Sequence, residues 1–131
     1  MKYVIWISLL VLFVNCSEDN VSEGITLEGD WVEVINRTDT LTFELLGDKP
    51  VMTLGRGVEI KNGNVLPKPN VGPYDYEVVN DKISLRWYLS SNSAFKEYYF
   101  DQTEDTIQVG NFYDDNAVGV ISVFKRIDQN L

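Results

Sequence analysis

The chain has 131 residues, which is enough for one domain with a hydrophobic core of its own. It is acidic, with 20 Asp and Glu against 11 Lys and Arg and a net charge of -9, which disfavours nucleic acid and anionic lipid as main partners. The chain has no His, so the commonest general base and the commonest metal ligand are missing. Its single cysteine, Cys16, excludes an intrachain disulfide.

The first fifteen residues have the layout of a secretory signal. Lys2 supplies the positive charge, and an apolar run over residues 3–14 follows it. The run is shorter than the roughly 20 residues that a membrane-spanning helix needs. It ends in Phe13-Val14-Asn15-Cys16, which resembles the lipobox of bacterial lipoproteins. In that family the cysteine is acylated on sulfur and becomes the new N-terminus, so the resemblance implies lipid attachment at Cys16.

The residues after the cysteine suggest where the protein is sent. Ser17-Glu18-Asp19-Asn20 resembles the export signal of Bacteroidetes-type surface lipoproteins, which implies the outer face of the outer membrane. A solvated acidic tether is the alternative interpretation of these four residues. We therefore expect a lipoprotein signal peptide at 1–15, a lipidated flexible tether at 16–24 and one folded domain at 25–131. Two or three acyl chains would hold such a protein stably on the membrane.

The folded part has the pattern of an all-β domain. Apolar and polar residues alternate over 40–46, which is typical of a half-buried strand. Gly, Asn, Asp and Pro separate the apolar runs, and no window keeps an apolar period of 3.6 residues. The expected strands are 29–35, 40–46, 51–56, 58–60, 74–79, 82–89, 94–102, 106–112 and 118–127.

Two connections between these strands are informative. Asn80-Asp81 separates two β-rich runs and predicts a two-residue hairpin turn. Residues 61–73 are predicted to form an irregular loop, because prolines at 67, 69 and 73 are incompatible with a central strand. About eight strands joined mostly by short turns predict an antiparallel up-and-down β-barrel, whose closure removes free strand edges.

A short motif opens the first strand. Gly29-Asp30-Trp31 resembles the G-x-W motif of the lipocalin and lipocalin-like families, and the resemblance covers about residues 25–127. It implies that Trp31 closes one end of the barrel beneath an arginine of the last strand, a position that Arg126 can fill. Gly29, Trp31 and Arg126 are then expected to form a structural barrel base. A β-sandwich, or another small barrel with an incidental G-x-W, is the alternative.

The sequence offers no obvious catalytic or metal-binding group. No nucleophile–base pair can be built from His, and no Asp or Glu lies within an apolar run where burial would shift its pKa. The acidic stretches 101–105 and 114–116 lack the spacing of a calcium loop and are interpreted as turns. We expect no catalytic activity, no cofactor and no metal.

Aromatic residues gather in the three strands between residues 74 and 102. Such rings fill a core by default, but they also line ligand cavities or stack on sugars. Alternation places Ile83, Leu85, Trp87 and Leu89 on the inward face of one strand. The candidate ligand-binding residues are Phe43, Tyr76, Trp87 and Tyr98.

These observations support two hypotheses about function. The first is a lipid-anchored, non-catalytic lipocalin-like protein that binds a small apolar or amphipathic ligand at the open end of its barrel. The second is a protein- or glycan-interaction module on the cell surface, with the barrel as scaffold. Its contact surface would contain outward-facing Tyr88 and either Tyr98 or Tyr99, beside the proline-bearing loop.

Replacing Cys16 with Ala tests the expected lipid attachment. The variant lacks the sulfur that carries the first acyl chain, so we expect it to incorporate no fatty acid and to leave the membrane fraction. Labelling of cells with radioactive palmitate, followed by fractionation, measures both effects. Globomycin should prevent processing of the unchanged chain, and palmitate on the Cys16→Ala variant would contradict the prediction.

Overall fold

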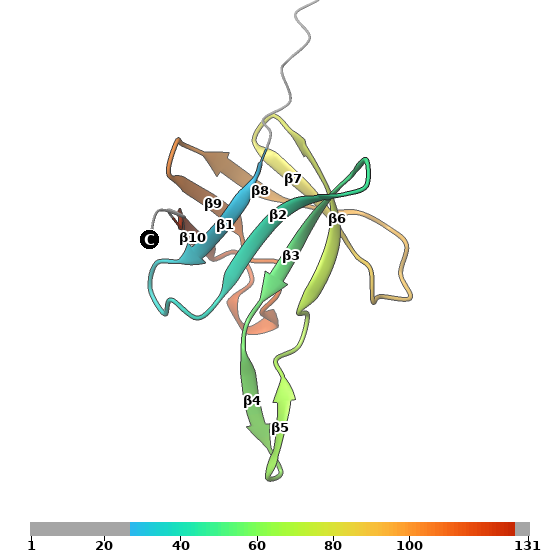
Figure 1. The fold of residues 1–131 in the computed structure, drawn as a ribbon, viewed down its shortest axis with the longest axis vertical. Coiled ribbons are helices and arrows are strands. Elements are labelled where there is room, and N and C mark those ends of the chain that lie inside the picture. The colour runs from blue at the N-terminus through green and yellow to red at the C-terminus, as the bar shows by residue number, and fades with distance from the viewer. Residues whose placement is uncertain (1–26, 128–131) are drawn as a thin grey trace, which may run out of the picture.

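Eight antiparallel strands close into a barrel, which confirms the predicted fold class and excludes the β-sandwich alternative. The computed structural model describes residues 27–127 (Figure 1). The leader and tether expected at 1–24, with Cys16, lie outside the described residues. Within the described range, no helix is long and apolar enough to cross a membrane.

The barrel is a meander with one insertion. Around the wall the strands follow the order β1-β10-β9-β8-β7-β6-β3-β2, and β1 pairs with β2 to complete the ring. The strands of the wall are β1 Gly29–Glu33, β2 Thr40–Leu46, β3 Lys49–Gly55, β6 Gly72–Val79, β7 Lys82–Trp87, β8 Lys96–Gln102, β9 Thr106–Gly110 and β10 Ile121–Arg126. Between β3 and β6 the chain forms a separate hairpin of β4 (Val58–Lys61) and β5 (Asn64–Pro67).

The two ends of the barrel differ because successive strands run in opposite directions. The chain enters at one end, which we call the base, and the short turns β2–β3, β6–β7 and β8–β9 lie there. The longer connections lie at the opposite end, which we call the mouth, and the hairpin projects from it (Figure 1). Binding residues usually occur on long connections that a rigid scaffold holds in place, so a binding site is expected at the mouth.

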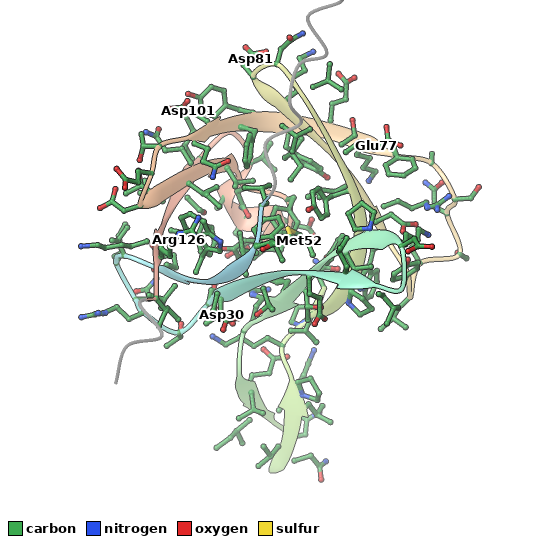
Figure 2. The ribbon with its side chains drawn as sticks, turned by 45° about the horizontal axis from the view of Figure 1, so that its top comes forward. Asp30, Met52, Glu77, Asp81, Asp101 and Arg126 are labelled. Atoms are coloured by element: carbon green, nitrogen blue, oxygen red, sulfur yellow. The ribbon has the colours of Figure 1, made fainter. Side chains whose placement is uncertain are left out.

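Side chains of the barrel fill its deep interior. Figure 2 shows Met52 inside the ring of strands, while Glu77, Asp81 and Asp101 lie on its outside. The largest fully buried side chains are Trp31, Phe43, Phe100, Phe124, Leu27, Leu41, Met52, Leu54, Ile83, Ile107 and Val109. An eight-stranded barrel has room for its own side chains or for one small ligand. Here the side chains occupy the middle, so a ligand has room only toward an end.

The base is closed by an aromatic ring and a guanidinium. Trp31 is fully buried, and Arg126 is its direct partner across the β1–β10 pair. The guanidinium carbon lies 4.4 Å from the centre of the indole ring, so the contact that the resemblance implies is present. Arg126 also donates a hydrogen bond to the backbone oxygen of Glu28. Gly29 has φ +93°, a conformation that a residue with a Cβ adopts only with strain.

The hairpin has one apolar face that no other part of residues 27–127 covers. In its register Val58 pairs with Pro67 and Ile60 with Val65, so these four side chains share a face. Val58, Ile60 and Val65 are 60%, 77% and 65% exposed. The tip between the strands is polar. A two-stranded hairpin alone is marginally stable in water, so its attachment to the barrel holds it in place.

Some predicted boundaries were wrong for identifiable reasons. The segment predicted as an irregular loop contains β5 and the start of β6, because an edge strand tolerates Pro67, whose missing N–H is not needed for the ladder. The last strand was expected from Val118 but begins at Ile121. The 3-10 helix η1 (Asp115–Ala117) precedes it, and the Asp114 carboxylate caps this helix by accepting the N–H of Asn116 at 3.0 Å. Leu89 was expected to face inward but is exposed, because β7 ends at Trp87.

Replacing Trp31 with Ala should destabilise the fold more than any comparable change at the mouth. We expect a loss of about 3–5 kcal/mol in the free energy of unfolding, since the change leaves a cavity under Arg126. Urea unfolding followed by circular dichroism measures it. Trp87→Ala is the matched control, because Trp87 is only partly buried and its loss should be smaller. Equal losses for the two tryptophans would contradict a special role for the base.

Candidate ligand-binding site at the mouth of the barrel

The connection between β9 and β10, residues 111–120, crosses the mouth, and we call it the crossing segment. It starts on one side of the ring, and its middle is held by residues from the opposite side. The backbone oxygen of Tyr113 accepts hydrogen bonds from Arg56 Nη1 at 3.2 Å and from Asn70 Nδ2 at 3.0 Å. Within the segment, the Asn111 side chain donates to the backbone oxygens of Asp114 and Ala117, at 2.7 and 3.1 Å. The segment is therefore folded on itself and fixed across the opening.

The crossing segment separates two cavities. One, of about 250 Å³, lies on the side of β6, β7 and β8, and we call it the aromatic pocket. The other, of about 610 Å³, lies on the side of β1 and β10 and is lined by charged groups that include Glu33, Asp39 and Arg56. Arg56 is held there by Asp39, whose Oδ2 lies 3.8 Å from Nε, and by the Tyr113 ring, whose centre lies 4.8 Å from the guanidinium carbon.

The aromatic pocket is built from four rings. Tyr74 on β6 and Trp87 on β7 are direct cross-strand partners, and their rings stack with centres 6.4 Å apart. Phe112 in the crossing segment meets Tyr74 edge to face at 5.3 Å and Tyr98 on β8 at 5.9 Å. Contacts of this geometry add to the stability that burial alone gives aromatic pairs. The rings are thus held in position before any ligand arrives.

Hydrogen bonds to the backbone fix two of these rings. The Trp87 indole donates to the backbone oxygen of Val71 at 3.1 Å, and the Tyr74 hydroxyl donates to that of Asn70 at 2.6 Å. Burial raises the pKa of Tyr74 and of Tyr98, and the charge of Asp115 raises that of Tyr98 further. Both phenols are therefore neutral at physiological pH. A polar rim completes the pocket, with side chains of Asn70, Ser90, Asn92 and Lys96.

The structure brings together two of the four candidate ligand-binding residues. Trp87 and Tyr98 line the aromatic pocket. Phe43 does not; it is 2% exposed and its ring packs edge to face against Tyr76, with centres 5.2 Å apart. Burial raises the pKa of Tyr76, with a smaller contribution from the Glu28 charge. Tyr76 lies two residues nearer the base than Tyr74 on β6, so Phe43 is a core residue and the partly buried Tyr76 packs against the core on the base side of the pocket.

Sequence reasoning missed Tyr74, Phe112 and the polar rim. Tyr74 could have been found, because it lies two residues before Tyr76 on the same strand and so shares its face. Phe112 could not, because it lies in the crossing segment, beyond the last residue of β9, where strand alternation no longer applies. The outward residues were placed correctly: Tyr88 and Tyr99 are exposed, and Tyr98 is the inward member of its pair.

Two carboxylates are buried, which corrects the expectation that none would be. Glu33 is 5% exposed and faces the interior beside Phe124, its cross-strand partner, and its Oε2 accepts the N–H of Asn36 at 2.6 Å. Asp75 is 3% exposed and lies on the outer face, because its neighbour Tyr74 faces the pocket. The two carboxylates are on opposite faces of the wall, so they do not form an acid–base pair.

Asp75 is enclosed by basic and phenolic side chains. It accepts from Arg86 Nε at 2.9 Å, and Lys49 Nζ lies 2.6 Å from its Oδ1. Burial by itself would raise the pKa of Asp75, but hydrogen bonds from Lys49, Tyr88 and Arg86 outweigh that effect and lower the pKa from 3.8 to about 2. These contacts tie β3, β6 and β7 together on the outside of the barrel, behind the aromatic pocket.

Across residues 27–127 no group of three or more His, Cys, Asp and Glu side chains is arranged to hold a metal ion. Comparison of the chain with protein-family models, with curated proteins and with solved structures gave no match.

Replacing Asp75 with Asn should produce a pH-dependent loss of stability. The folded pKa is lowered from 3.8 to about 2, so the carboxylate stabilises the fold above pH 3.8 and loses this effect as the pH falls toward 2. We expect the variant to be less stable by about 1–3 kcal/mol at pH 7 and to match the unchanged chain near pH 2. Urea unfolding at several pH values measures this, with exposed Asp101→Asn as control. If the difference in the free energy of unfolding between the variant and the unchanged chain did not change with pH, the stabilising role of the Asp75 carboxylate would be contradicted.

Proposed function

We propose that this protein is a lipid-anchored, non-catalytic lipocalin-like protein of the outer membrane, exposed at the cell surface, which binds a small amphipathic ligand in the aromatic pocket. The observation that carries the proposal is the convergence of Tyr74, Trp87, Tyr98 and Phe112 on one cavity with a polar rim. Concave apolar sites with a few placed polar groups are the usual form of small-molecule sites.

The size of the cavity limits the ligand. Ligand pockets for drug-sized molecules usually measure about 300–1,000 Å³. The aromatic pocket has about 250 Å³ and the middle of the barrel is filled, so the ligand is smaller than such molecules or leaves part of its surface in water. An amphipathic molecule with one apolar part fits this better than a fully apolar one, since its polar part can remain at the rim.

The arrangement of the barrel is compatible with the proposed anchor. The described chain enters β1 at the base, and the mouth is at the opposite end (Figure 1). If Cys16 carries the lipid, the ten residues 17–26 connect it to the base and reach at most about 35 Å when extended. The tether would then leave from the end opposite the mouth, so the attachment itself would not obstruct the mouth. The Trp31–Arg126 contact supports the lipocalin-like assignment, because it is the pairing that the G-x-W resemblance implies.

A second candidate function is a protein-interaction module, and the β4–β5 hairpin favours it. Its uncovered apolar face consists of Val58, Ile60, Val65 and Pro67. The face is aliphatic and has no aromatic ring on which a sugar could stack, so a protein partner is favoured over a glycan. The tip at residues 61–64 is polar, which disfavours insertion into a membrane. This candidate places the essential surface on the hairpin, whereas the first places it in the aromatic pocket.

Binding of N-phenyl-1-naphthylamine, an uncharged probe that fluoresces in apolar sites, tests the first candidate. We expect the lipid-free mature chain 17–131 to bind it, because this chain retains the whole barrel. Tyr98→Ala should weaken binding about tenfold, which corresponds to ~1.4 kcal/mol. Tyr99→Ala is the matched control, because Tyr99 is the adjacent residue on the outward face of β8.

Two results would count against the pocket. One is a lack of probe binding by the unchanged chain, which would leave the hairpin as the favoured surface. The other is equal weakening by Tyr98→Ala and Tyr99→Ala, which would show that the probe binds on the outside of the barrel. Circular dichroism of each variant confirms that the barrel remains folded during the measurement.

A further inference from the structure

We infer that the ligand of the aromatic pocket is an anion: a small molecule with a flat apolar body and one carboxylate, sulfonate or similar group, which Lys96 binds. This inference rests on the proposed function and names the ligand class of the same site. It is carried by the position of Lys96, by its lack of a carboxylate partner and by the hydrogen-bonding state of the rim.

Lys96 lies on the inward face of β8, at the mouth, where it is exposed to solvent. It is the first residue of β8, and its direct cross-strand partner is buried Leu85. Alternation along the strand places it on the same face as Tyr98 and the buried Phe100. It is the one charged residue among those that line the aromatic pocket. Lys96 is therefore the residue that brings a positive charge to the rim of the pocket.

No acidic side chain within residues 27–127 forms an ion pair with Lys96. The adjacent Glu97 points to the other face of β8, where its carboxylate lies 3.0 Å from Lys82 Nζ. Asp115 is close enough to the Tyr98 hydroxyl to raise its pKa, but it does not line the pocket. In a chain with a net charge of -9, an inward-facing cation without a partner leaves a local site for negative charge.

The β7–β8 loop contributes side chains with free hydrogen-bond donors to the lining of the pocket. Ser90 Oγ accepts the N–H of Asn92 at 3.0 Å, and Asn92 Oδ1 accepts the N–H of Ala94 at 2.9 Å. Each of these oxygens already accepts one hydrogen bond from the backbone, while the Ser90 hydroxyl hydrogen and the Asn92 amide hydrogens remain to be donated. The Asn70 carbonyl is the one side-chain amide acceptor at the rim that these bonds leave open.

The donors and the cation together fit an anion. Lys96 supplies an ammonium, Ser90 and Asn92 supply neutral donors, and Tyr98 supplies a phenol that burial keeps protonated. A hydrogen bond in which one partner is ionised is about twice as strong as a neutral one. A neutral ligand would gain no charge-assisted hydrogen bond from the ammonium, whereas an anion would. The stacked Tyr74 and Trp87 rings complete the site with a flat apolar surface.

Two fluorescent probes with the same ring skeleton test the inference. 1-Anilinonaphthalene-8-sulfonate carries a sulfonate, and N-phenyl-1-naphthylamine is the same molecule without it. We expect Lys96→Gln in the mature chain to weaken binding of the sulfonate about tenfold and binding of the uncharged probe less than about twofold. Lys82→Gln is the control, because Lys82 is paired with Glu97 on the outer face and should change neither affinity.

Salt provides a second measurement that does not depend on any substitution at the site. Raising the ionic strength to about 1 M shortens the Debye length to ~3 Å and should weaken sulfonate binding by the unchanged chain. It should have little effect on the uncharged probe, or on the sulfonate in the Lys96→Gln variant. Circular dichroism of Lys96→Gln should match that of the unchanged chain, because Lys96 is exposed.

The outcomes separate this inference from the proposed function. If both probes bind and Lys96→Gln weakens them equally, or weakens neither, the pocket exists but the inference of an anionic ligand is wrong. If the unchanged chain binds neither probe, the proposed function fails and the inference fails with it. Selective loss of the sulfonate, together with salt dependence that disappears in Lys96→Gln, supports the assignment of Lys96 as the anion-binding residue.

Discussion

Closure of the sheet through the β1–β10 pair is the constraint on which the structure depends. The pair brings the first and last strands of the described chain together, so the barrel cannot form until almost the whole chain is present. Trp31 and Arg126 are opposite each other at this seam, and the guanidinium covers the indole ring. One contact therefore joins the ends of the chain and fills the base. Contacts between residues this distant in sequence form late and slowly in folding, since a long loop must close first.

The same closure determines where cavities lie in the barrel. With the middle of the barrel filled by its own side chains, the two cavities at the mouth lie where the strands end and the longer connections begin. The crossing segment divides that space into an aromatic part and a charged part with different chemistry. Asn111, Arg56 and Asn70 hold the segment in place by hydrogen bonds to its backbone. The division of the mouth into two cavities is thus made by a ten-residue connection, while strand residues supply most of the aromatic lining.

The sequence predicts the wall of this protein better than its mouth, and particular residues show why. Alternation identified the buried faces of β2 and β7, and G-x-W with Arg126 identified the base, because these signals are local and periodic. Of the four candidate residues, Trp87 and Tyr98 line the aromatic pocket. Phe43 is in the core and Tyr76 packs against it. Alternation predicts which face of a strand a residue is on, but it does not predict how far along the barrel axis that residue lies. Phe112 lies in a connection whose path is set by side-chain hydrogen bonds, for which the sequence has no period. Asp75 is buried because Arg86, Lys49 and Tyr88 cover it from neighbouring elements, which no local pattern reveals.

The two stems of the β4–β5 hairpin end in residues that hold the crossing segment. Arg56 precedes the hairpin and Asn70 follows it, and both donate to the same backbone oxygen of Tyr113. Arg56 also donates to the backbone oxygen of Pro69 at 3.0 Å, which links one stem to the other. Any tilt of the hairpin that separates its stems must lengthen at least one of these three hydrogen bonds. A force applied to the tip of the hairpin would therefore act on the hydrogen bonds that hold the crossing segment, whose Phe112 lines the aromatic pocket.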